Sequence, residues 1–207
     1  MGVITYAVAA DWIRGRTAPV LPRLVAVDGP SGSGKSTFAA HLAAALGDAE
    51  VVEIDDFVSW DNLAGWWPRL ETEVLGPLLA GDDAVYQQRD WAGDPLGDRL
   101  GGWRPVAGAP VVILEGVTAS RQAIADRLTL AVWVEAPAEV RLERGVRRDG
   151  EAMRSRWVEW MRREDAFFAT DRTRDRAHLH VDGAPAISPG ATRWFAGQFS
   201  AARGARR

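Results

Sequence analysis

A glycine-rich loop that holds a single lysine constrains this chain more than any other feature. Residues 29–36 read Gly-Pro-Ser-Gly-Ser-Gly-Lys-Ser, which fits the pattern G-x-x-x-x-G-K-[ST]. Such a loop joins a buried strand to a helix, and its backbone N–H groups cradle the phosphates of a nucleoside triphosphate. Lys35 is the only lysine among the 25 Lys and Arg residues. A lysine reaches phosphate oxygens here as a compact charge, which the planar, bulkier guanidinium of arginine does not replace.

The bulk composition narrows the class of protein. The chain has 207 residues, 47% hydrophobic and 26% charged, and we expect residues 1–207 to form one globular domain. A net charge of −3 argues against a nucleic acid or a membrane surface as the partner. Zero cysteines exclude a disulfide framework and thiolate metal ligands. No apolar run approaches the ~18 residues of a membrane span, and residues 1–10 lack a signal-peptide pattern, so we expect a cytoplasmic protein.

Short apolar runs alternate with helical patterns along the chain. The apolar runs predict buried strands over residues 23–28, 50–54, 110–114, 129–135 and 178–181. Helical spacing predicts helices over residues 5–16, 35–46, 70–80, 121–128 and 137–148, and a last one to about 168 after a charged break. Residues 81–109 are rich in Gly, Pro and Asp and are predicted to be irregular, with a short strand at 85–88. The alternation predicts an α/β fold of three layers, with a parallel sheet covered by helices on both faces.

Ligands of such sheets bind at the carboxyl ends of the strands, where three suggestive groups lie. In the glycine loop we expect the nucleotide to contact Gly29, Ser31, Gly32, Ser33, Gly34, Lys35, Ser36 and Thr37. Glu115 ends the strand over 110–114; it can hold Mg²⁺ together with the Ser36 hydroxyl, or stand there as a solvated acid. Asp55 and Asp56 follow the strand over 50–54. One of them can orient an acceptor hydroxyl and accept its proton, or both can cap a turn.

Arginines surround a predicted break between two helices at Asp149-Gly150. They are Arg144, Arg147, Arg148 and Arg154. They can close over a transferring phosphoryl group as a lid over about residues 144–156. The alternative is an ordinary charged helix face, in which they pair with neighbouring acids.

Taken in order along the chain, these motifs resemble those of a known family. They are the glycine loop, Asp55-Asp56-Phe57, Leu114-Glu115-Gly116 and the segment 141–149. The set resembles the uridine kinase-like nucleoside kinases of the P-loop superfamily, which include the nicotinamide riboside kinases. The resemblance covers about residues 23–183 and leaves the tail 184–207 unassigned. It implies a three-layer P-loop NTPase fold with a small arginine-containing lid.

The resemblance implies roles for single residues of the phosphate site. Asp55 would be the base that orients the acceptor hydroxyl, and Glu115 would serve the Mg²⁺ site. Arg144 and Arg148 would be the lid arginines, and with Lys35 they would act on the transferring phosphoryl group.

On the acceptor side the resemblance is weaker. Asp90, followed by Trp91, is similar to the aspartate of a Tyr-Asp-aromatic acceptor motif, in which Arg89 stands in place of the tyrosine. The His and Arg that follow this motif in the family have no clear counterpart in residues 92–102. The phosphate machinery therefore carries over more completely than the acceptor specificity.

The motifs and the resemblance together predict a kinase. It would use Mg²⁺ and transfer the γ-phosphoryl group of ATP, or of another nucleoside triphosphate, to a hydroxyl of a small molecule, a nucleoside first. A sugar acid, a vitamin precursor or a nucleoside monophosphate is an alternative acceptor. A monophosphate needs a further basic cluster, which Arg69, Arg89, Arg99 and Arg104 could supply. A non-catalytic nucleotide-binding switch or a partner-activated ATPase is the alternative from another class. The oligomeric state stays open.

Overall fold

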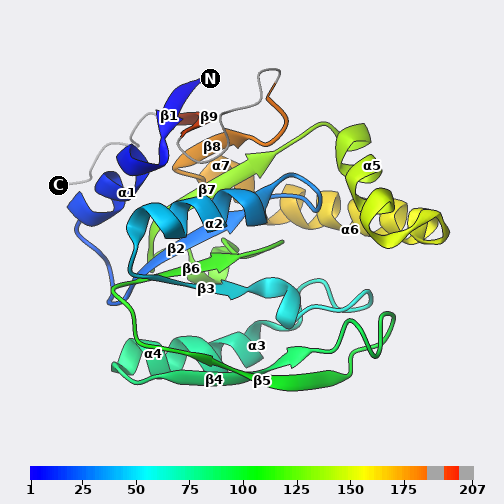
Figure 1. Ribbon diagram of the computed structural model, residues 1–207, viewed down its shortest axis with the longest axis horizontal. Coiled ribbons are helices and arrows are strands. Elements are labelled where there is room, and N and C mark those ends of the chain that lie inside the picture. Colours follow the sequence, from blue (N-terminus) through cyan, green and yellow to red (C-terminus); the bar gives the residue numbers. More distant parts are fainter. Residues whose placement is uncertain (186–193, 201–207) are drawn as a thin grey trace.

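The computed structural model describes residues 1–185 and 194–200, which form a central sheet between layers of helices (Figure 1). The strands of the sheet are β1 (Gly2–Thr5), β2 (Arg23–Asp28), β3 (Ala49–Glu53), β6 (Val111–Glu115), β7 (Leu128–Glu135), β8 (Leu179–Asp182) and β9 (Trp194–Phe199). Their order across the sheet is β1-β9-β8-β7-β2-β6-β3. The five strands from β8 to β3 are parallel to one another, whereas β9 and β1 are antiparallel to their neighbours. The predicted α/β architecture is confirmed, with two antiparallel strands added at one edge.

Strand β2 lies at the centre of this arrangement. Every residue from Leu24 to Asp28 is buried, so the strand needs apolar side chains on both of its faces. Leu24 and Ala26 pack into the hydrophobic cluster on one side of the sheet, while Val25 and Val27 pack into the cluster on the other. Successive side chains of β2 thus point to opposite faces of the sheet and contribute to the hydrophobic cluster on each face.

One face of the sheet is covered by α1 (Tyr6–Gly15) and α2 (Lys35–Leu46) (Figure 1). Helix α2 begins directly after Gly34 and ends at Gly47, and both glycines have left-handed backbone conformations, with φ of +103° and +76°. The N–H of Gly47 donates to the carbonyl of Ala43 and closes the last turn. Between these ends, Phe38 and Leu42 pack against the sheet.

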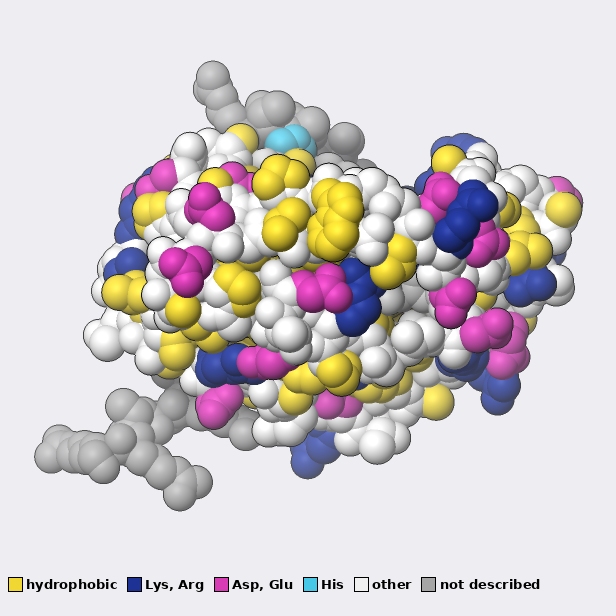
Figure 2. All heavy atoms as spheres, turned by 90° about the horizontal axis from the view of Figure 1, so that it is seen from below, with side chains coloured by type: hydrophobic (Ala, Val, Ile, Leu, Met, Phe, Trp, Pro, Cys, Tyr) yellow, Lys and Arg dark blue, Asp and Glu magenta, His cyan; other side chains and the backbone are white. Residues whose placement is uncertain are grey.

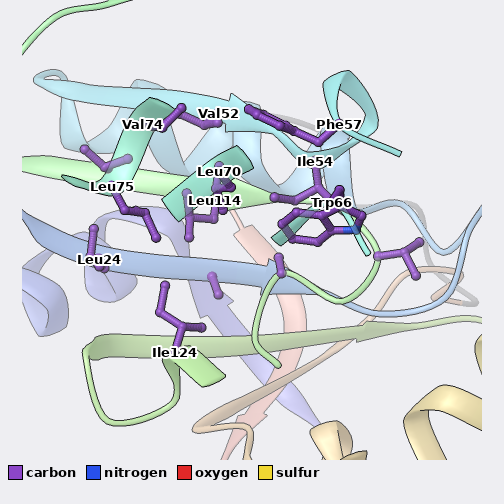
Figure 3. Close-up of a cluster of buried hydrophobic side chains, with 14 of the residues drawn as sticks. Leu24, Val52, Ile54, Phe57, Trp66, Leu70, Val74, Leu75, Leu114 and Ile124 are labelled. Atoms are coloured by element: carbon purple, nitrogen blue, oxygen red, sulfur yellow. The ribbon is translucent and has the colours of Figure 1, made fainter. Parts of the chain in front are cut away.

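The opposite face carries α3 (Trp67–Leu70), the π-helical turn η2 (Glu71–Leu75), α4 (Gly76–Ala80) and α6 (Arg154–Asp171). Figure 3 shows Leu24, Ile54 and Leu114 from the sheet side packed against Trp66 and Leu70. All of these side chains are less than 3% exposed. Burial of such large apolar side chains contributes roughly 1.5–3 kcal/mol each and makes this cluster a main source of stability.

A separate antiparallel hairpin, β4 (Ala84–Arg89) and β5 (Leu100–Val106), packs beyond α3 and α4 (Figure 1). Only a short strand at 85–88 was predicted in this region, and β5 was missed. The sequence of β5, Leu-Gly-Gly-Trp-Arg-Pro-Val, is poor in strand-forming residues. Pairing with β4 and burial of Tyr86 and Val106 in the core hold the hairpin in place.

One local prediction is wrong, and one confirmed strand is shifted by a single residue, each for an identifiable reason. The helix predicted over 121–128 is only the 3-10 turn η3 (Gln122–Ile124), and β7 already begins at Leu128. Ile124 and Leu128 are both buried, so their spacing of four residues imitates a helical face. The strand predicted over 50–54 runs over Ala49–Glu53 instead, because Ile54 begins the 3-10 turn η1 (Ile54–Asp56). The tail 184–207 lies largely outside the described residues, although it contributes β9.

The segment after β7 projects from the body of the molecule. Helix α5 (Ala138–Asp149) leads to Gly150, whose φ of +95° breaks the helix, and the turn η4 (Glu151–Met153) leads into α6. We call residues 144–156 the lid segment. After α6 the short helix α7 (Thr173–Arg176) leads to β8. In Figure 2, basic and acidic side chains alternate over the end of the molecule at which the lid segment and the tip of the hairpin lie. Among the described residues, no helix has the length and apolarity that a membrane crossing requires.

Candidate functional site

The loop between β2 and α2 is built so closely against its surroundings that its glycines are required. A Cβ on Gly29, at φ +138°, would lie 2.0 Å from the carbonyl oxygen of Val134. A Cβ on Gly32, at φ +76°, would lie 2.7 Å from the carbonyl oxygen of Arg141. Both contacts are with backbone atoms, which cannot rotate away. The loop therefore needs glycine for space as well as for conformation.

The loop opens on a cavity of about 560 Å³. Its lining includes most of the predicted phosphate contacts and four other predicted site residues: Ser31, Gly32, Gly34, Lys35, Ser36 and Thr37, with Asp55, Glu115, Arg144 and Arg148. Gly29 and Ser33 belong to the loop but do not line the cavity, and Ser33 is fully buried. The carboxyl ends of β2 and β6 lie in register, with Val27 opposite Glu115, which brings the loop and the acid to one edge of the sheet.

Lys35 is folded onto its own loop. Its ammonium group donates a hydrogen bond of 3.2 Å to the carbonyl of Pro30, and only 7% of the residue is exposed. Burial raises the pKa of three carboxyls, those of Asp28, Glu115 and Glu164, and the positive charge of Lys35 opposes this rise in each. One cation thus acts on three buried acids, of which Glu115 alone lines the cavity.

Glu115 is a buried acid beside the Ser36 hydroxyl. Burial raises the pKa of Glu115 to about 7, while Lys35 opposes this rise and Asp55 adds to it. A hydrogen bond with Ser36 also favours the charged form of the carboxyl. A hydroxyl and one carboxylate, both oxygen donors, fit the usual way that proteins hold Mg²⁺ beside a nucleotide. Within residues 1–185 and 194–200, no three His, Cys, Asp or Glu side chains group closely enough to hold a metal ion by themselves.

Asp55 and Asp56 have separate environments. Asp55 is exposed and lines the cavity, and its charge acts on both Glu115 and Arg148. Asp56 is 7% exposed and lies turned away, toward the hairpin. The residue types alone left open which of these two acids faces the cavity. The direction of the backbone in the turn η1 decides it.

The four arginines of the lid segment divide in the same way. Arg144 and Arg148 line the cavity. Arg144 donates 3.0 Å hydrogen bonds to the carbonyls of Gly32 and Gly183, so it ties the loop to the end of β8. Arg148 pairs with Asp149 and leaves 66% of its side chain exposed. The other two, Arg147 and Arg154, make exposed ion pairs with Glu143 and Glu151 on the helix surface.

Arg89 and Asp90, which were predicted to bind the acceptor, form hydrogen bonds within the hairpin instead. The Arg89 guanidinium donates to the carbonyls of Asp90, Asp94, Gly97 and Arg99. The Asp90 carboxylate accepts from the Gly93 N–H and from Arg99. Both side chains thus stabilise the loop between β4 and β5, and neither lines the cavity.

Trp91 is bonded to the turn that carries Asp55, a residue that lines the cavity. Its indole N–H donates a hydrogen bond of 2.8 Å to the backbone carbonyl of Asp55. Its ring also lies under the guanidinium of Arg89, at 4.5 Å from the ring centroid. Trp91 therefore connects the hairpin loop to the turn that carries Asp55.

The basic cluster considered for a monophosphate acceptor is not assembled in the structure. Arg69 pairs with Glu73, and Arg104 pairs with Asp56. The remaining members, Arg89 and Arg99, serve the hairpin loop as described. None of the four lines the cavity.

The overall arrangement is found in proteins of known structure. Comparisons of the sequence with protein-family models and with curated proteins find no match. Among solved structures, the chain is similar to a possible uridine kinase from Bacillus stearothermophilus, with a TM-score of 0.62 and 18% identity over 84% of this chain and 96% of that one. It is also similar to a candidate fructose transport system kinase from Silicibacter sp. TM1040, with a TM-score of 0.56 and 24% identity over 84% and 95% of the two chains. This chain has the uridine kinase-like P-loop fold.

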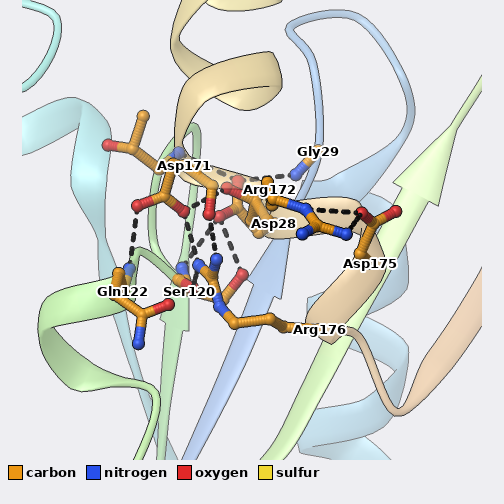
Figure 4. A network of polar contacts seen from close by, with 10 residues as sticks. Asp28, Gly29, Ser120, Gln122, Asp171, Arg172, Asp175 and Arg176 are labelled. Carbon is orange, nitrogen blue, oxygen red and sulfur yellow. Dashed lines mark hydrogen bonds and ion pairs between the residues drawn. The ribbon is translucent and has the colours of Figure 1, made fainter.

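Two acids beside the P-loop were missed by sequence reasoning. Asp28, the last residue of β2, is fully buried and accepts hydrogen bonds from the N–H groups of Gly29, Thr118 and Ser120 and from the Ser120 hydroxyl (Figure 4). Burial raises the pKa of Asp28 to about 6, and the hydrogen bonds from Ser120 and Gly29 oppose the rise. The sequence signal that could have identified Asp28 is an acid at the end of an otherwise apolar strand.

The second missed acid is Glu164, which is also fully buried and bonds to Ser31 of the P-loop. It follows Trp160 by four residues and precedes Phe168 by four, on the buried face of α6. A single acid on an apolar helix stripe marks a buried partner. That signal was present in the sequence.

Proposed function

We propose that this protein is a small-molecule kinase, which transfers the γ-phosphoryl group of ATP or another nucleoside triphosphate to a hydroxyl group of a nucleoside-like acceptor. One observation carries the proposal: Lys35 of the P-loop, Asp55 and Arg148 line a single cavity. A cation for the phosphates, an acid for the incoming alcohol and a second cation from the lid segment are the parts that phosphoryl transfer to an alcohol needs.

The proposed reaction assigns one task to each of these residues. Asp55 accepts the proton of the acceptor hydroxyl as the new P–O bond forms and the bond from the γ-phosphorus to the bridging oxygen breaks, which leaves the nucleoside diphosphate. Lys35 and Arg148 balance the charge on the oxygens of the moving group. Arg144 keeps the P-loop in position through the carbonyl of Gly32. Ser36 and Glu115 would hold Mg²⁺, which when bound neutralises phosphate charge.

The acceptor is proposed from the resemblance of the motifs and from the likeness to a possible uridine kinase. A sugar is the second candidate, because the other similar structure is that of a candidate fructose transport system kinase. In either case Trp91, which bonds to the carbonyl of Asp55, would lie beside the acceptor. We further propose that residues 1–207 act as one domain in the cytoplasm, without a nucleic acid or membrane partner.

A screen of possible acceptors tests this proposal directly. ADP release is measured with ATP and Mg²⁺ against a panel of nucleosides, sugars, sugar acids and nucleoside monophosphates. We expect release that depends on one acceptor class and that falls by at least about 100-fold in Lys35→Ala. Equal ADP release with and without every acceptor would instead favour an ATPase. If calorimetry detects no binding of any nucleoside triphosphate, the proposal is wrong.

A further inference from the structure

A carboxylate is buried directly beside the P-loop. Glu164, on α6, is 0% exposed. Its two oxygens accept the backbone N–H of Ser31 at 3.0 and 3.1 Å, and one of them also accepts the Ser31 hydroxyl. The indole N–H of Trp160 donates to the same carboxylate. All of these partners are donors, so Glu164 acts here as an acceptor only, which suits an ionised carboxylate.

The opposite charge comes from α5. The guanidinium of Arg141, 6% exposed, has a nitrogen 3.6 Å from a Glu164 oxygen. The backbone of Arg141 also forms the surface on which Gly32 packs. A buried charge is tolerated when an opposite charge and hydrogen bonds compensate its lost hydration. The P-loop therefore packs against an ion pair between α5 and α6, the two helices that the lid segment joins.

These contacts engage both hydrogen-bond donors of Ser31. Its N–H is taken by Glu164, and its hydroxyl donates to Glu164 and accepts from Trp160 at 3.0 Å. Ser31 is thus turned toward α6, although it lines the cavity. Of the amides that follow it in the loop, that of Ser33 donates to the carbonyl of Pro30, which leaves those of Gly32 and Gly34 for a phosphate group.

The same helix contacts two other parts of the site. The Trp157 indole donates a hydrogen bond of 2.9 Å to Asp149, the partner of Arg148 in the lid segment. Arg163 donates to the backbone carbonyls of Trp60 and Asp61, in the segment that follows Asp55. Helix α6 is therefore bonded to the P-loop, to the lid segment and to the segment near the proposed base.

We infer that Glu164 is a positioning residue, which sets the P-loop against α6. It thereby holds the phosphate-binding amides in a fixed position relative to Arg148 of the lid segment. The inference rests on the proposed function for its kinetic consequence. Glu164 does not line the cavity, so it acts through Ser31 and not on a reacting atom.

Glu164→Gln is the test, because the amide keeps the size of the side chain but loses its charge and one acceptor oxygen. The matched control is Glu159→Gln, on the same helix, which removes an exposed ion pair with Arg162. We expect Glu164→Gln to raise the Kd and the KM for ATP about tenfold, with less than a twofold change in the KM for the acceptor. Glu159→Gln should match the wild-type protein in all three values.

A change of equal size in both KM values, or no difference between the two variants, would overturn the inference. Ser31→Ala is the second variant if Glu164→Gln does not fold. It removes the hydroxyl contacts with Glu164 and Trp160 but keeps the backbone N–H bond to Glu164, so the KM for ATP should rise in the same direction by about threefold, and an unchanged value would also count against Glu164.

Hydrogen exchange separates this inference from the proposed function. In the absence of nucleotide, the amides of residues 31–34 should exchange at least about tenfold faster in Glu164→Gln than in Glu159→Gln. Unaltered exchange would show that Glu164 does not anchor the loop. Faster exchange in a protein that binds no nucleotide would keep the anchor and refute the kinase.

Discussion

The carboxylate of Asp56 accepts a hydrogen bond of 2.6 Å from the hydroxyl of Tyr86, a residue with no exposed surface. Arg104 donates to the same carboxylate at 3.1 Å. Asp56 thus attaches both strands of the hairpin to the turn η1, while its neighbour Asp55 stays open to the cavity. Two adjacent acids of identical type therefore have different tasks, one structural and one proposed for catalysis.

This division predicts opposite phenotypes for two matched substitutions. Asp55→Asn should lower kcat at least about 100-fold and change the free energy of unfolding by less than about 0.5 kcal/mol. Asp56→Asn should lower the free energy of unfolding by about 2–3 kcal/mol, because Arg104 and Tyr86 lose a charged acceptor. Urea unfolding and steady-state kinetics on both variants measure the two quantities. Equal kcat losses in two stable variants would contradict the division.

The lid segment offers a pair of neighbouring arginines for comparison. Arg148 lines the cavity, whereas Arg147 pairs with Glu143 on the exposed helix surface. Arg148→Ala should lower kcat by about 100-fold or more, since a cation on the transferring phosphoryl group acts chiefly in the transition state. Arg147→Ala should leave kcat within twofold. Comparable losses in both would mean that the charge of the helix face, and not one placed guanidinium, matters.

Replacing Gly145, in the middle of α5, by alanine has two opposing effects on stability. Alanine normally stabilises a helix by about 1 kcal/mol relative to glycine. Here a Cβ would lie 2.4 Å from the ring of Trp157, which is 2% exposed and cannot move aside. Overpacking costs about 1–3 kcal/mol, so Gly145→Ala should lower the free energy of unfolding. Gly15→Ala, at the end of α1 with nothing within 4 Å of the added carbon, is the control and should be neutral or stabilising.

Asp28 predicts a pH dependence of stability. Because burial raises its pKa from 3.8 to about 6, the folded state holds a proton that the unfolded state has already lost between these two pH values. Stability contributed by this group is therefore complete below pH 3.8 and is lost as the pH rises to about 6, by about 3 kcal/mol. Urea unfolding of the wild-type protein between pH 4 and pH 7 should show this fall.

Asp28→Asn supplies the control for that measurement, because asparagine does not titrate. The variant should be less stable at every pH, since its NH2 group meets N–H donors in either orientation, those of Gly29 and Thr118 at one oxygen position or that of Ser120 at the other. Its decline in the free energy of unfolding between pH 4 and pH 6 should nevertheless be smaller than that of the wild-type protein, and the part that remains comes from Glu115, whose pKa burial raises to about 7. Parallel pH profiles in the two proteins would show that another group causes the fall.

Much of the fold was predictable because its determinants are local. The apolar runs of β2, β6 and β7 and the helix after Lys35 follow from residue type and spacing. Strand β5 was missed because Gly101, Gly102 and Pro105 carry no strand signal, and the strand exists only through its pairing with β4. The helix predicted at 121–128 failed for the converse reason, since two buried residues four apart can also belong to a turn and a strand.

The amino-acid sequence by itself determined the P-loop, because three closely spaced glycines and one lysine at the junction of a strand and a helix specify a local backbone shape. Only the tertiary structure decided which of Asp55 and Asp56 meets the cavity, and that Glu164, 133 positions after Ser31, lies against the loop. The physical reason is one of distance along the chain. A turn's direction and a contact between remote segments depend on how layers pack, and no spacing within a short window encodes that packing.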